Sequence, residues 1–327
     1  MTVRQAVLLV GGRATRMWPI TAEVPKGLLP LAGLPFIEYQ ITRLAELGVD
    51  EVLLTVGTHL LDEWEAFASR PVGGVDLRLI VEDLPLDTAG GVRSVLDELD
   101  DRFFVLNGDV ILEADLRPLV TDVNAEATLA LVEVDDTSAY GVVVVGGDGR
   151  VERFLEKMPT ADAPARTVNA GVYVLSRGAL EDYPPGPLSF ERTVFPDLAG
   201  RSALAAVTLD GRWLDIGTPT LYLDAHGGML GGDGGAWSWI DPSATVAPEA
   251  MIEDAVVLGG ARIGPGAVVR RGVIGWDAVV GDEATITGDS MIGARAVVGA
   301  RCELAGGVRL APDAVLGEAA IRFQPPE

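Results

Sequence analysis

The C-terminal part of the chain carries a repeat of apolar residues, and this repeat limits the fold more than any other feature. The apolar positions recur every sixth residue, apart from two steps of five that end at Ile263 and Ile274. They are Ile240, Val246, Ile252, Leu258, Ile263, Val269, Ile274, Val280, Ile286, Ile292, Val298, Leu304, Leu310 and Leu316. A sustained period of six predicts a parallel β-helix with three faces per coil. Burying these side chains at about 2 kcal/mol each gives the stack a substantial core.

The residues before the repeat show an alternation of strand-like and helix-like stretches, which is typical of an α/β sheet. Apolar runs at 6–10, 51–56 and 103–106 predict buried strands. Strand-like segments between 127 and 175 predict an antiparallel excursion from that sheet. The α/β class therefore covers the chain up to the repeat.

The glycine-rich segment 231–235 separates the two parts and has the composition of a flexible linker. The predicted organisation is an α/β domain at 1–230, a linker at 231–238, a β-helix at 239–318 and a tail at 319–327.

Charge and cysteine content exclude several classes of protein. The 327 residues carry a net charge of −23, which argues against nucleic acid or an anionic membrane as a partner. The N-terminus runs straight into a short strand, and no apolar run approaches the ~20 residues of a membrane helix. A single cysteine, Cys302, excludes an internal disulfide. We therefore expect a cytoplasmic protein in a reducing compartment.

The stretch from Gly11 to Pro19 follows the first predicted strand and contains candidate phosphate ligands. Gly11 and Gly12 allow a close backbone approach, and Arg16 and Lys26 add two cations. Lys26 is one of only two lysines in the chain, and a compact ammonium is not equivalent to arginine against a phosphate. No GxxxxGKS/T motif is present, so this is not a P-loop. An ordinary strand-to-loop turn with surface cations fits these residues equally well.

Two aspartates follow predicted strands and are candidate metal ligands. Asp109 comes directly after the strand at 103–106, and Asp215 follows a strand that ends at Leu214. Open α/β sheets bind ligands at the carboxyl ends of their strands, and two carboxylates suit a hard cation such as Mg²⁺. The segment Thr88-Ala89-Gly90-Gly91 predicts a helix start, which offers free N–H groups to a ligand or is a simple cap.

Seven short motifs occur together in the order of a known family. They follow an opening signature, Gly11–Pro19 with Pro25-Lys26, and are Asp87–Gly91, Phe104–Asp109, Tyr140–Val142, Phe154–Lys157, Asn169–Gly171, Glu191–Phe195 and Trp213–Thr218. The chain resembles the sugar-nucleotide pyrophosphorylases, which join a nucleoside triphosphate to a sugar 1-phosphate. Within that family it is most similar to mannose-1-phosphate guanylyltransferases. The resemblance implies a Rossmann-like mixed sheet followed by a short left-handed parallel β-helix.

The resemblance also implies roles for individual residues. The nucleotide would contact Gly11, Gly12, Ala14, Thr15, Arg16, Thr88, Ala89, Gly90 and Asp109. Catalysis would depend on Arg16, Lys26 and Asp109, and Mg²⁺ would be held by Asp109 and Asp215. The sugar phosphate would contact Gly141, Glu156, Lys157 and Asn169. GTP and mannose 1-phosphate are the implied substrates, with UTP or another nucleotide, and a glucose, heptose or cyclitol phosphate, as alternatives.

Four positions depart from the family pattern and keep a non-catalytic regulatory paralogue open as an alternative. Ala14 and Asp87 stand where the family commonly has glycine, Gly27 stands at a frequent proline, and Met158 displaces a proline by one position. A left-handed backbone at residue 14 would cost alanine roughly 1 kcal/mol, which is too little to abolish activity. Both aspartates and both lysines are intact, and this favours an active enzyme.

The predicted β-helix lacks the features of a second catalytic centre. Hexapeptide acyltransferases need a base between coils, usually histidine, and the only histidines, His59 and His226, precede the repeat. We therefore expect this part to serve assembly, as a homo-oligomer joined through the β-helix. Apolar Ile321 and Phe323 in the tail would cover the last strand edges or meet a partner chain.

Overall fold

The computed structural model describes residues 3–122, 124–156, 159–231 and 236–323. The chain divides into two compact units. The first contains Met1–Gly12 and Ile37–Leu214, and the second contains Arg13–Phe36 and Asp215–Glu327. The loop after the first strand thus belongs to the same unit as the β-helix. The domain limits at 230, 238 and 318 stay predictions from the sequence.

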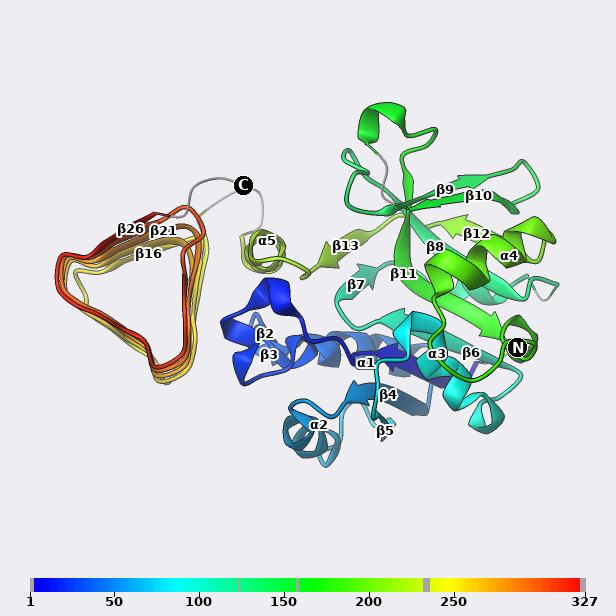
Figure 1. Ribbon diagram of the computed structural model, residues 1–327, viewed down its shortest axis with the longest axis horizontal. Coiled ribbons are helices and arrows are strands. Elements are labelled where there is room, and N and C mark those ends of the chain that lie inside the picture. The colour runs from blue at the N-terminus through cyan, green and yellow to red at the C-terminus, as the bar shows by residue number, and fades with distance from the viewer. Residues whose placement is uncertain (1–2, 123, 157–158, 232–235, 324–327) are drawn as a thin grey trace. The chain divides into compact units, whose positions relative to one another are not determined.

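The first unit is built on a mixed sheet, whose nine strands within the described residues include the order β10-β9-β11-β6-β1-β4-β5 (Figure 1). The parallel part consists of β1 (Gln5–Leu9), β4 (Glu51–Gly57), β5 (Asp76–Glu82) and β6 (Arg102–Asn107). In this part Val7 pairs with both Leu53 and Val105 in register. Strands buried on both faces read as continuous apolar runs, so their positions were predictable.

The antiparallel excursion joins this sheet through β11, which pairs with β6 on one side. Its strands are β8 (Ala127–Glu133), β9 (Gly141–Val145), β10 (Val151–Glu156), β11 (Thr167–Ser176) and β12 (Leu204–Thr208). β12 pairs with β8, and β8 pairs with β11. A separate two-stranded sheet is formed by β7 (Val110–Glu113) and β13 (Arg212–Asp215). The predicted α/β class with a mixed sheet is confirmed.

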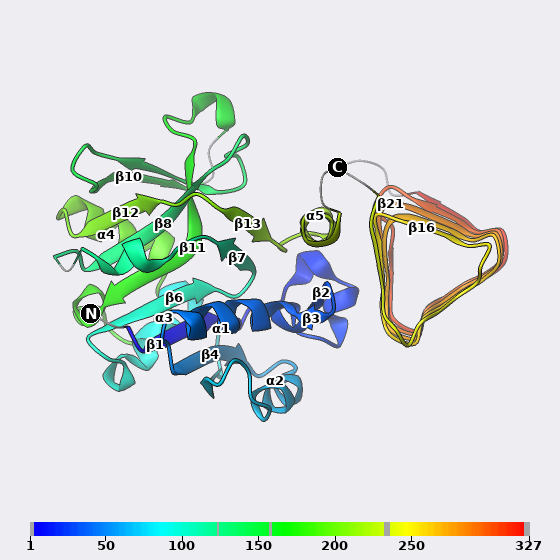
Figure 2. The ribbon, with the colours of Figure 1, turned by 180° about the vertical axis from the view of Figure 1, so that it is seen from behind.

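Helices cover both faces of the parallel part. α1 (Phe36–Glu46) lies over one face and α3 (Asp87–Ser94) over the other, as the two opposite views show (Figures 1 and 2). α2 (Leu61–Ala68) packs beside β4 and β5, and α4 (Phe195–Gly200) follows a π-helical turn, Phe190–Val194. The 3-10 turns are Thr15–Met17, Ile20–Ala22, Lys26–Leu28, Leu96–Glu98, Arg117–Val120, Thr160–Asp162 and Arg177–Ala179.

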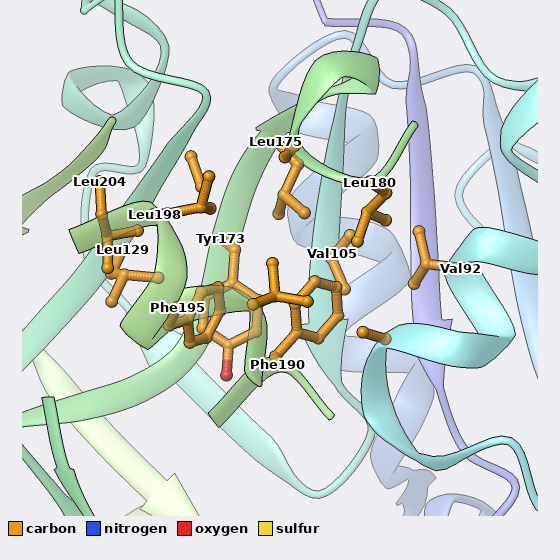
Figure 3. Packing of buried hydrophobic residues seen from close by; sticks show 14 of the residues in the cluster. Val92, Val105, Leu129, Tyr173, Leu175, Leu180, Phe190, Phe195, Leu198 and Leu204 are labelled. Atoms are coloured by element: carbon orange, nitrogen blue, oxygen red, sulfur yellow. The ribbon is translucent and has the colours of Figure 1, made fainter. Parts of the chain in front are cut away.

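Aromatic rings form the centre of the core between the excursion and α4 (Figure 3). The rings of Phe190 and Phe195 stack with centroids 5.1 Å apart, and the ring of Tyr173 meets Phe195 edge-on at 5.0 Å. All three side chains are fully buried. Such pairs add about 0.5–1.5 kcal/mol beyond the burial of their area, so this cluster fixes β11 against the helical segment.

The repeat region forms a parallel β-helix whose coils have a triangular outline (Figure 1). Its strands are β14 (Ser238–Ile240), β15 (Thr245–Val246), β16 (Met251–Glu253), β17 (Ala255–Val257), β18 (Arg262–Ile263), β19 (Val268–Ile274), β20 (Val279–Val280), β21 (Thr285–Ile292), β22 (Val297–Val298), β23 (Glu303–Ala305), β24 (Arg309–Leu310), β25 (Val315–Leu316) and β26 (Ile321–Phe323). The register runs Val246, Ile263, Val280, Val298, Leu316 from coil to coil. The predicted β-helix is confirmed.

One position of the predicted repeat was wrong. Val257, and not Leu258, pairs with Ile240 of the preceding coil and with Ile274 of the following coil. The first step of five residues in the repeat therefore ends at Val257. Both Val257 and Leu258 are buried, which is why the spacing alone did not separate them. β26 pairs with β23 and carries the stack into the segment predicted as a tail.

Charged residues occupy corners of the β-helix with left-handed backbone conformations. Asp289, Arg295 and Asp313 have φ values of 60°, 58° and 59°. The Nε atom of Arg295 lies 2.7 Å from Oδ1 of Asp313, one coil further on. Such corner pairs are exposed and add little stability individually. Within the described ranges, the structure contains no helix long and apolar enough to cross a membrane.

Candidate active site

The glycine pair after β1 leaves its backbone accessible. Gly11 and Gly12 are both exposed. A Cβ on Gly11 would lie at ordinary contact distance, 3.4 Å from the carbonyl oxygen of Thr55. Among the described residues, no heavy atom lies within 4 Å of the point that a Cβ on Gly12 would occupy. Packing within the described chain does not require glycine here, and this favours a ligand as the reason for the pair.

The loop that follows begins with a residue in the left-handed region. Ala14 has φ 47° and ψ 42° and precedes the 3-10 turn Thr15–Met17. The hydroxyl of Thr21 donates to the carbonyl oxygen of Ala14 at 3.1 Å. Met17 is fully buried, whereas Thr15 and Arg16 are exposed. The turn therefore anchors itself through Met17 and leaves the predicted nucleotide-binding side chains at its surface.

Lys26 opens the next 3-10 turn of the loop, Lys26–Leu28, directly after the buried Pro25. Its side chain is half-buried, and the turn is closed by a bond from the amide of Leu29 to the carbonyl oxygen of Lys26 at 3.1 Å. Leu29 is fully buried and so anchors the turn Lys26–Leu28 in the core. Gly27 is buried too, so the position where the family often has proline is packed inside the unit.

Arg16 and Asp215 lie against the same glycine of the second unit. A Cβ on Gly217 would lie 3.1 Å from Nη2 of Arg16 and 2.9 Å from Oδ1 of Asp215. The amide of Gly217 donates to Oδ1 of Asp215 at 2.5 Å. Any larger residue at 217 would displace one of these side chains. The structure thus brings together a predicted phosphate-binding cation and a predicted metal ligand, which are far apart in the sequence.

Asp109 stands in the two-residue link between β6 and β7 in the first unit. A Cβ on Gly108 would collide with the Val10 side chain, so glycine is required there for close packing. Gln40 of α1 donates from Nε2 to the carbonyl oxygens of Asn107, at 2.8 Å, and Val110, at 2.5 Å. This buried amide spans the link and fixes the backbone on both sides of Asp109.

Gln40 is a residue that the sequence analysis missed. It lies on the buried side of α1, among the apolar residues Ile37, Ile41 and Leu44, and is only 2% exposed. A polar residue at a core position of an amphipathic helix was the available signal, since buried amides need partners.

The predicted sugar-phosphate residues of the excursion lie in one row across three strands. Gly141 of β9 pairs directly with Glu156 of β10. On the other side of β9, Val142 pairs with Val168 of β11, which places Asn169 next in the row. The structure therefore brings together the backbone positions of Gly141, Glu156 and Asn169. Lys157 lies outside the described residues.

A bulge in β11 sets the direction of Asn169. The pairing with β8 shifts between Asn169 and Tyr173, where Gly171 adopts φ 74°. A Cβ on Gly171 would lie 2.8 Å from Nδ2 of Asn107, so only glycine fits. Asn169 accepts from the amide of Gly171 at 3.0 Å and donates to the Tyr173 hydroxyl at 2.9 Å. Burial raises the pKa of Tyr173 well above its usual value, so this hydroxyl stays protonated.

The start of α3 differs from the prediction of free N–H groups. The amides of Ala89 and Gly90 donate to the carbonyl oxygen of Leu188, at 2.8 and 3.0 Å. The hydroxyl of Thr88 donates to Glu191 at 2.9 Å. Of the two alternatives, free amides are excluded for Ala89 and Gly90, because a distant segment supplies the acceptor, which the local sequence does not reveal. A nucleotide-binding role for these three residues stays a prediction and does not rest on those amides.

Glu82, at the end of β5, is a second residue that the sequence analysis missed. Its Oε2 accepts from the amide of Leu86 at 3.2 Å, and a methyl group on Gly91 would collide with its Oε1. Burial raises the pKa of this carboxyl group. A half-buried carboxylate against a glycine of the Thr88–Gly91 motif is an arrangement suited to a ligand with N–H donors.

The donors available for a metal are few. Among the described residues, no group of three or more histidine, cysteine, aspartate or glutamate side chains is arranged to hold an ion. Asp109 and Asp215 are both half-buried. Asp109 directly follows Gly108, and Asp215 lies against Gly217. Single carboxylates suit a hard cation that takes its remaining ligands from water and substrate phosphates, and they do not suit a protein cage.

Comparison with known proteins identifies the family. A model of the family described as nucleotidyl transferase matches residues 5–230. The chain belongs to the nucleotidyl transferase family. The mannose-1-phosphate guanylyltransferase of Mycobacterium tuberculosis is 34% identical over 269 residues, which are 78% of this chain and 74% of that protein. A probable mannose-1-phosphate guanylyltransferase of Oryza sativa is 36% identical, over 78% of this chain and 70% of that protein.

Two solved structures share the fold of about two thirds of this chain. HddC from Yersinia pseudotuberculosis, in its complex with GMP-PN, aligns with a TM-score of 0.61 and 26% identity. The alignment covers 69% of this chain and all of HddC. A putative glucose-1-phosphate thymidylyltransferase from Bacillus anthracis aligns with a TM-score of 0.62 at 24% identity, over 68% of this chain and 94% of that one.

Proposed function

We propose that this nucleotidyl transferase joins GTP to mannose 1-phosphate and releases GDP-mannose and pyrophosphate. The curated relatives from M. tuberculosis and rice carry the name of this activity, and each is matched over at least 70% of its length. The complex of HddC with GMP-PN adds a structural neighbour that holds a guanine nucleotide.

The observation that carries the proposal is the placement of Arg16 and Asp215 against Gly217. A guanidinium binds phosphate oxygens, and a carboxylate beside it binds a cation that itself binds phosphates. Asp215 also accepts from the amide of Gly217, and this bond fixes its carboxylate beside the Arg16 guanidinium. Together the two side chains match what a triphosphate and its cation need. The exposed turn Thr15–Met17 and the open backbone of Gly12 are suited to the same ligand.

The reaction requires an in-line attack on the α-phosphorus of GTP. An oxygen of mannose 1-phosphate forms the new P–O bond, while the bond from the α-phosphorus to its bridging oxygen breaks. The electron pair leaves with pyrophosphate, and the attacking phosphate is already ionised, so no base has to remove a proton. The protein contributes positioning and charge stabilisation. In this proposal Arg16 and Lys26 stabilise the negative charge that develops on the phosphates.

Mg²⁺ is the proposed cofactor, because each of the two carboxylates, taken by itself, suits a hard cation. Asp109 and Asp215 would hold it, because single carboxylate ligands leave room for phosphate oxygens. When bound, the ion would neutralise phosphate charge and favour the leaving of pyrophosphate. Gln40 keeps the link that carries Asp109 in one conformation through its two bonds to neighbouring carbonyl groups.

The row Gly141, Glu156 and Asn169 is the proposed sugar site, with Lys157 as the ligand of the sugar phosphate. The bulge at Gly171 and the bond to Tyr173 hold the Asn169 amide in one orientation. Glu82 supports guanine as the base, because guanine presents N–H donors that a carboxylate accepts. The Glu82 carboxylate is partly buried and accepts from the Leu86 amide, so its orientation is fixed.

An active enzyme is compatible with two of the four departures from the family pattern, and of the others Met158 lies outside the described residues. Ala14 and Asp87, which stand at common glycine positions, have φ values of 47° and 63°. The backbone therefore keeps the left-handed conformation that glycine would give, at a cost of about 1 kcal/mol for each residue. The loop geometry survives the substitutions.

We further propose that the protein is a homo-oligomer joined through the β-helix. Met251, Val315, Ile321 and Phe323 are large apolar side chains that are at least half exposed on this part of the chain. Exposed apolar groups of this size are suited to self-association.

A screen of nucleotides against sugar phosphates tests the proposed substrates. GTP, UTP, ATP and dTTP would each be combined with mannose, glucose and heptose 1-phosphates, and pyrophosphate release would be followed. We expect the highest kcat/KM for GTP with mannose 1-phosphate, by at least about tenfold. A higher value for another pair would replace the substrate assignment, and no release with any pair would contradict the proposed function.

A further inference from the structure

Arg309 of the β-helix is bonded to the backbone of the loop that carries Arg16. Its Nη1 donates to the carbonyl oxygens of Arg16 and Trp18, both at 2.6 Å. These carbonyls lie at the end of the turn Thr15–Met17, and the last carbonyl groups of a helical turn need donors from outside the turn. A guanidinium that satisfies two carbonyl groups at once makes charge-assisted bonds, which are stronger than those between neutral groups.

The loop has other anchors within the same compact unit. Arg295, at a β-helix corner, donates to both carboxylate oxygens of Glu23, at 2.9 and 2.5 Å, and this pairing lowers the pKa of Glu23. The hydroxyl of Tyr222 in α5 (Pro219–Leu230) donates to the carbonyl oxygen of Pro30 at 2.5 Å. Arg309 is the anchor that reaches the turn carrying Arg16 itself.

The internal bonds of this turn are short-range. The amides of Met17 and Trp18 donate to the carbonyl oxygens of Ala14 and Thr15, at 2.9 and 3.2 Å. Ala14 adds a left-handed backbone that alanine disfavours. A single-turn segment with such a residue does not hold one conformation on its own, so an external constraint decides where the Arg16 backbone lies.

We propose that Arg309 is a positioning residue for the nucleotide-binding turn, and that the β-helix in this way takes part in the reaction as well as in assembly. The proposal rests on the proposed role of Arg16 in binding the triphosphate. Arg309 acts through the backbone of Arg16 and Trp18, and it needs no contact with the substrate. Small displacements of a positioned cation reduce rates strongly, so loosening this turn affects the nucleotide step first.

The first test measures the mobility of the turn without any substrate. Arg13 and Arg16 are exposed, and trypsin cleaves after arginine only where the chain opens. We expect Arg309→Met to be cleaved after Arg13 or Arg16 about tenfold faster than the wild type, with fragments identified by mass spectrometry. The control is Arg270→Met. Arg270 lies on the same β-helix, is bonded to Glu253 at 2.7 Å and, like Arg309, lies 3.7 Å from a methionine sulfur.

The second test separates positioning from general damage by steady-state kinetics of the full chain. For Arg309→Met we expect the KM for GTP to rise about tenfold, with the KM for mannose 1-phosphate changed less than twofold. Arg309→Lys keeps a cationic donor and should recover most of the lost GTP affinity. Arg270→Met should match the wild type in both constants. Melting temperatures of all variants identify any loss of folding, and Arg309→Lys keeps the test decisive if Arg309→Met unfolds.

Equal cleavage rates in Arg309→Met and the wild type would overturn the proposal, and so would an equal rise of both KM values. Failure of the proposed function is distinguishable from these outcomes. A wild-type protein that transfers no nucleotide contradicts the proposed function, whereas the cleavage rates alone decide whether Arg309 holds the turn.

Discussion

At the scale of single residues, Ala14, which stands where the family commonly has glycine, shows how the loop tolerates backbone strain. Ala14 keeps a left-handed conformation because its neighbours hold it there, with the Thr21 hydroxyl bonded to its carbonyl oxygen. The sequence analysis anticipated the cost of alanine at this position, and the observed φ of 47° shows that the cost applies. The contact with Thr21 that helps to offset it was not predictable, because the sequence does not show how the loop folds back on itself.

Ala14→Gly removes this strain. We expect the free energy of unfolding to change little or to rise by up to about 1 kcal/mol, and the turnover rate to be equal or higher. Urea denaturation and initial rates check this. Ala22→Gly is the control, because Ala22 ends a 3-10 turn of the same loop and should lose about 0.5–1 kcal/mol. A tenfold loss of nucleotide affinity in Ala14→Gly would contradict the proposed geometry of the loop.

Lys26→Ala removes a charge that we place at the reacting phosphates. The turnover rate should fall by about 10²-fold or more, with a native circular dichroism spectrum, because transition-state stabilisation is lost. Arg4→Ala is the control. Arg4 is another cation among residues 1–30 but pairs with Asp50 at the surface, so its removal should leave the rate near that of the wild type. Near-normal turnover of Lys26→Ala would remove Lys26 from the mechanism.

At the scale of elements, buried strands and the repeat were predictable, whereas details set by distant segments were not. The apolar runs of β1, β4 and β6 gave strand positions to within a residue or two. The sequence left free amides or a simple cap as alternatives at the start of α3, and two of these amides donate to Leu188, from another part of the chain. The repeat position at Val257 was misplaced by one residue because both Val257 and Leu258 are buried and fit the spacing. Local pattern does not encode such partners.

The bulge in β11 is the element that we expect to control sugar specificity. Asn169→Ala should raise the KM for mannose 1-phosphate about tenfold and leave the KM for GTP within twofold. The reason is that the bulge positions a residue of the proposed sugar site and none of the proposed nucleotide site. The Tyr173 hydroxyl would lose one partner, so a stability loss of about 1–3 kcal/mol should accompany the change. Separate titrations of the two substrates and thermal unfolding check both effects. An equal rise in both KM values would show that this row is not the sugar site.

At the scale of the whole molecule, the unexpected result is that the loop at 13–36 shares a compact unit with the β-helix. The sequence analysis assigned the β-helix to assembly alone, because it carries no catalytic pattern of its own. Bonds from Arg295 and Arg309 to the loop give it a further place in the mechanism. Pairings over such sequence distances leave no mark in a single sequence, so this connection could be found only in the structure.

Truncation after residue 235 should therefore have two effects. The particle mass from light scattering should fall by more than the missing residues account for, or the protein should aggregate, because the proposed oligomer surface is gone. Nucleotidyl transfer should fall as well, since Arg309 no longer holds the turn. A truncated chain with unchanged oligomer number and full activity would refute both roles of the β-helix.

Exchange of radiolabelled pyrophosphate into GTP tests the central claim most directly, because it follows the bond that the proposed reaction breaks and remakes. With Mg²⁺ and mannose 1-phosphate present, label should enter GTP, and it should stay in pyrophosphate when the sugar phosphate or the metal is left out. Direct in-line transfer predicts this dependence, since no nucleotide is ever attached to the protein. No exchange under the complete conditions, or exchange that proceeds without the sugar phosphate, would contradict the account.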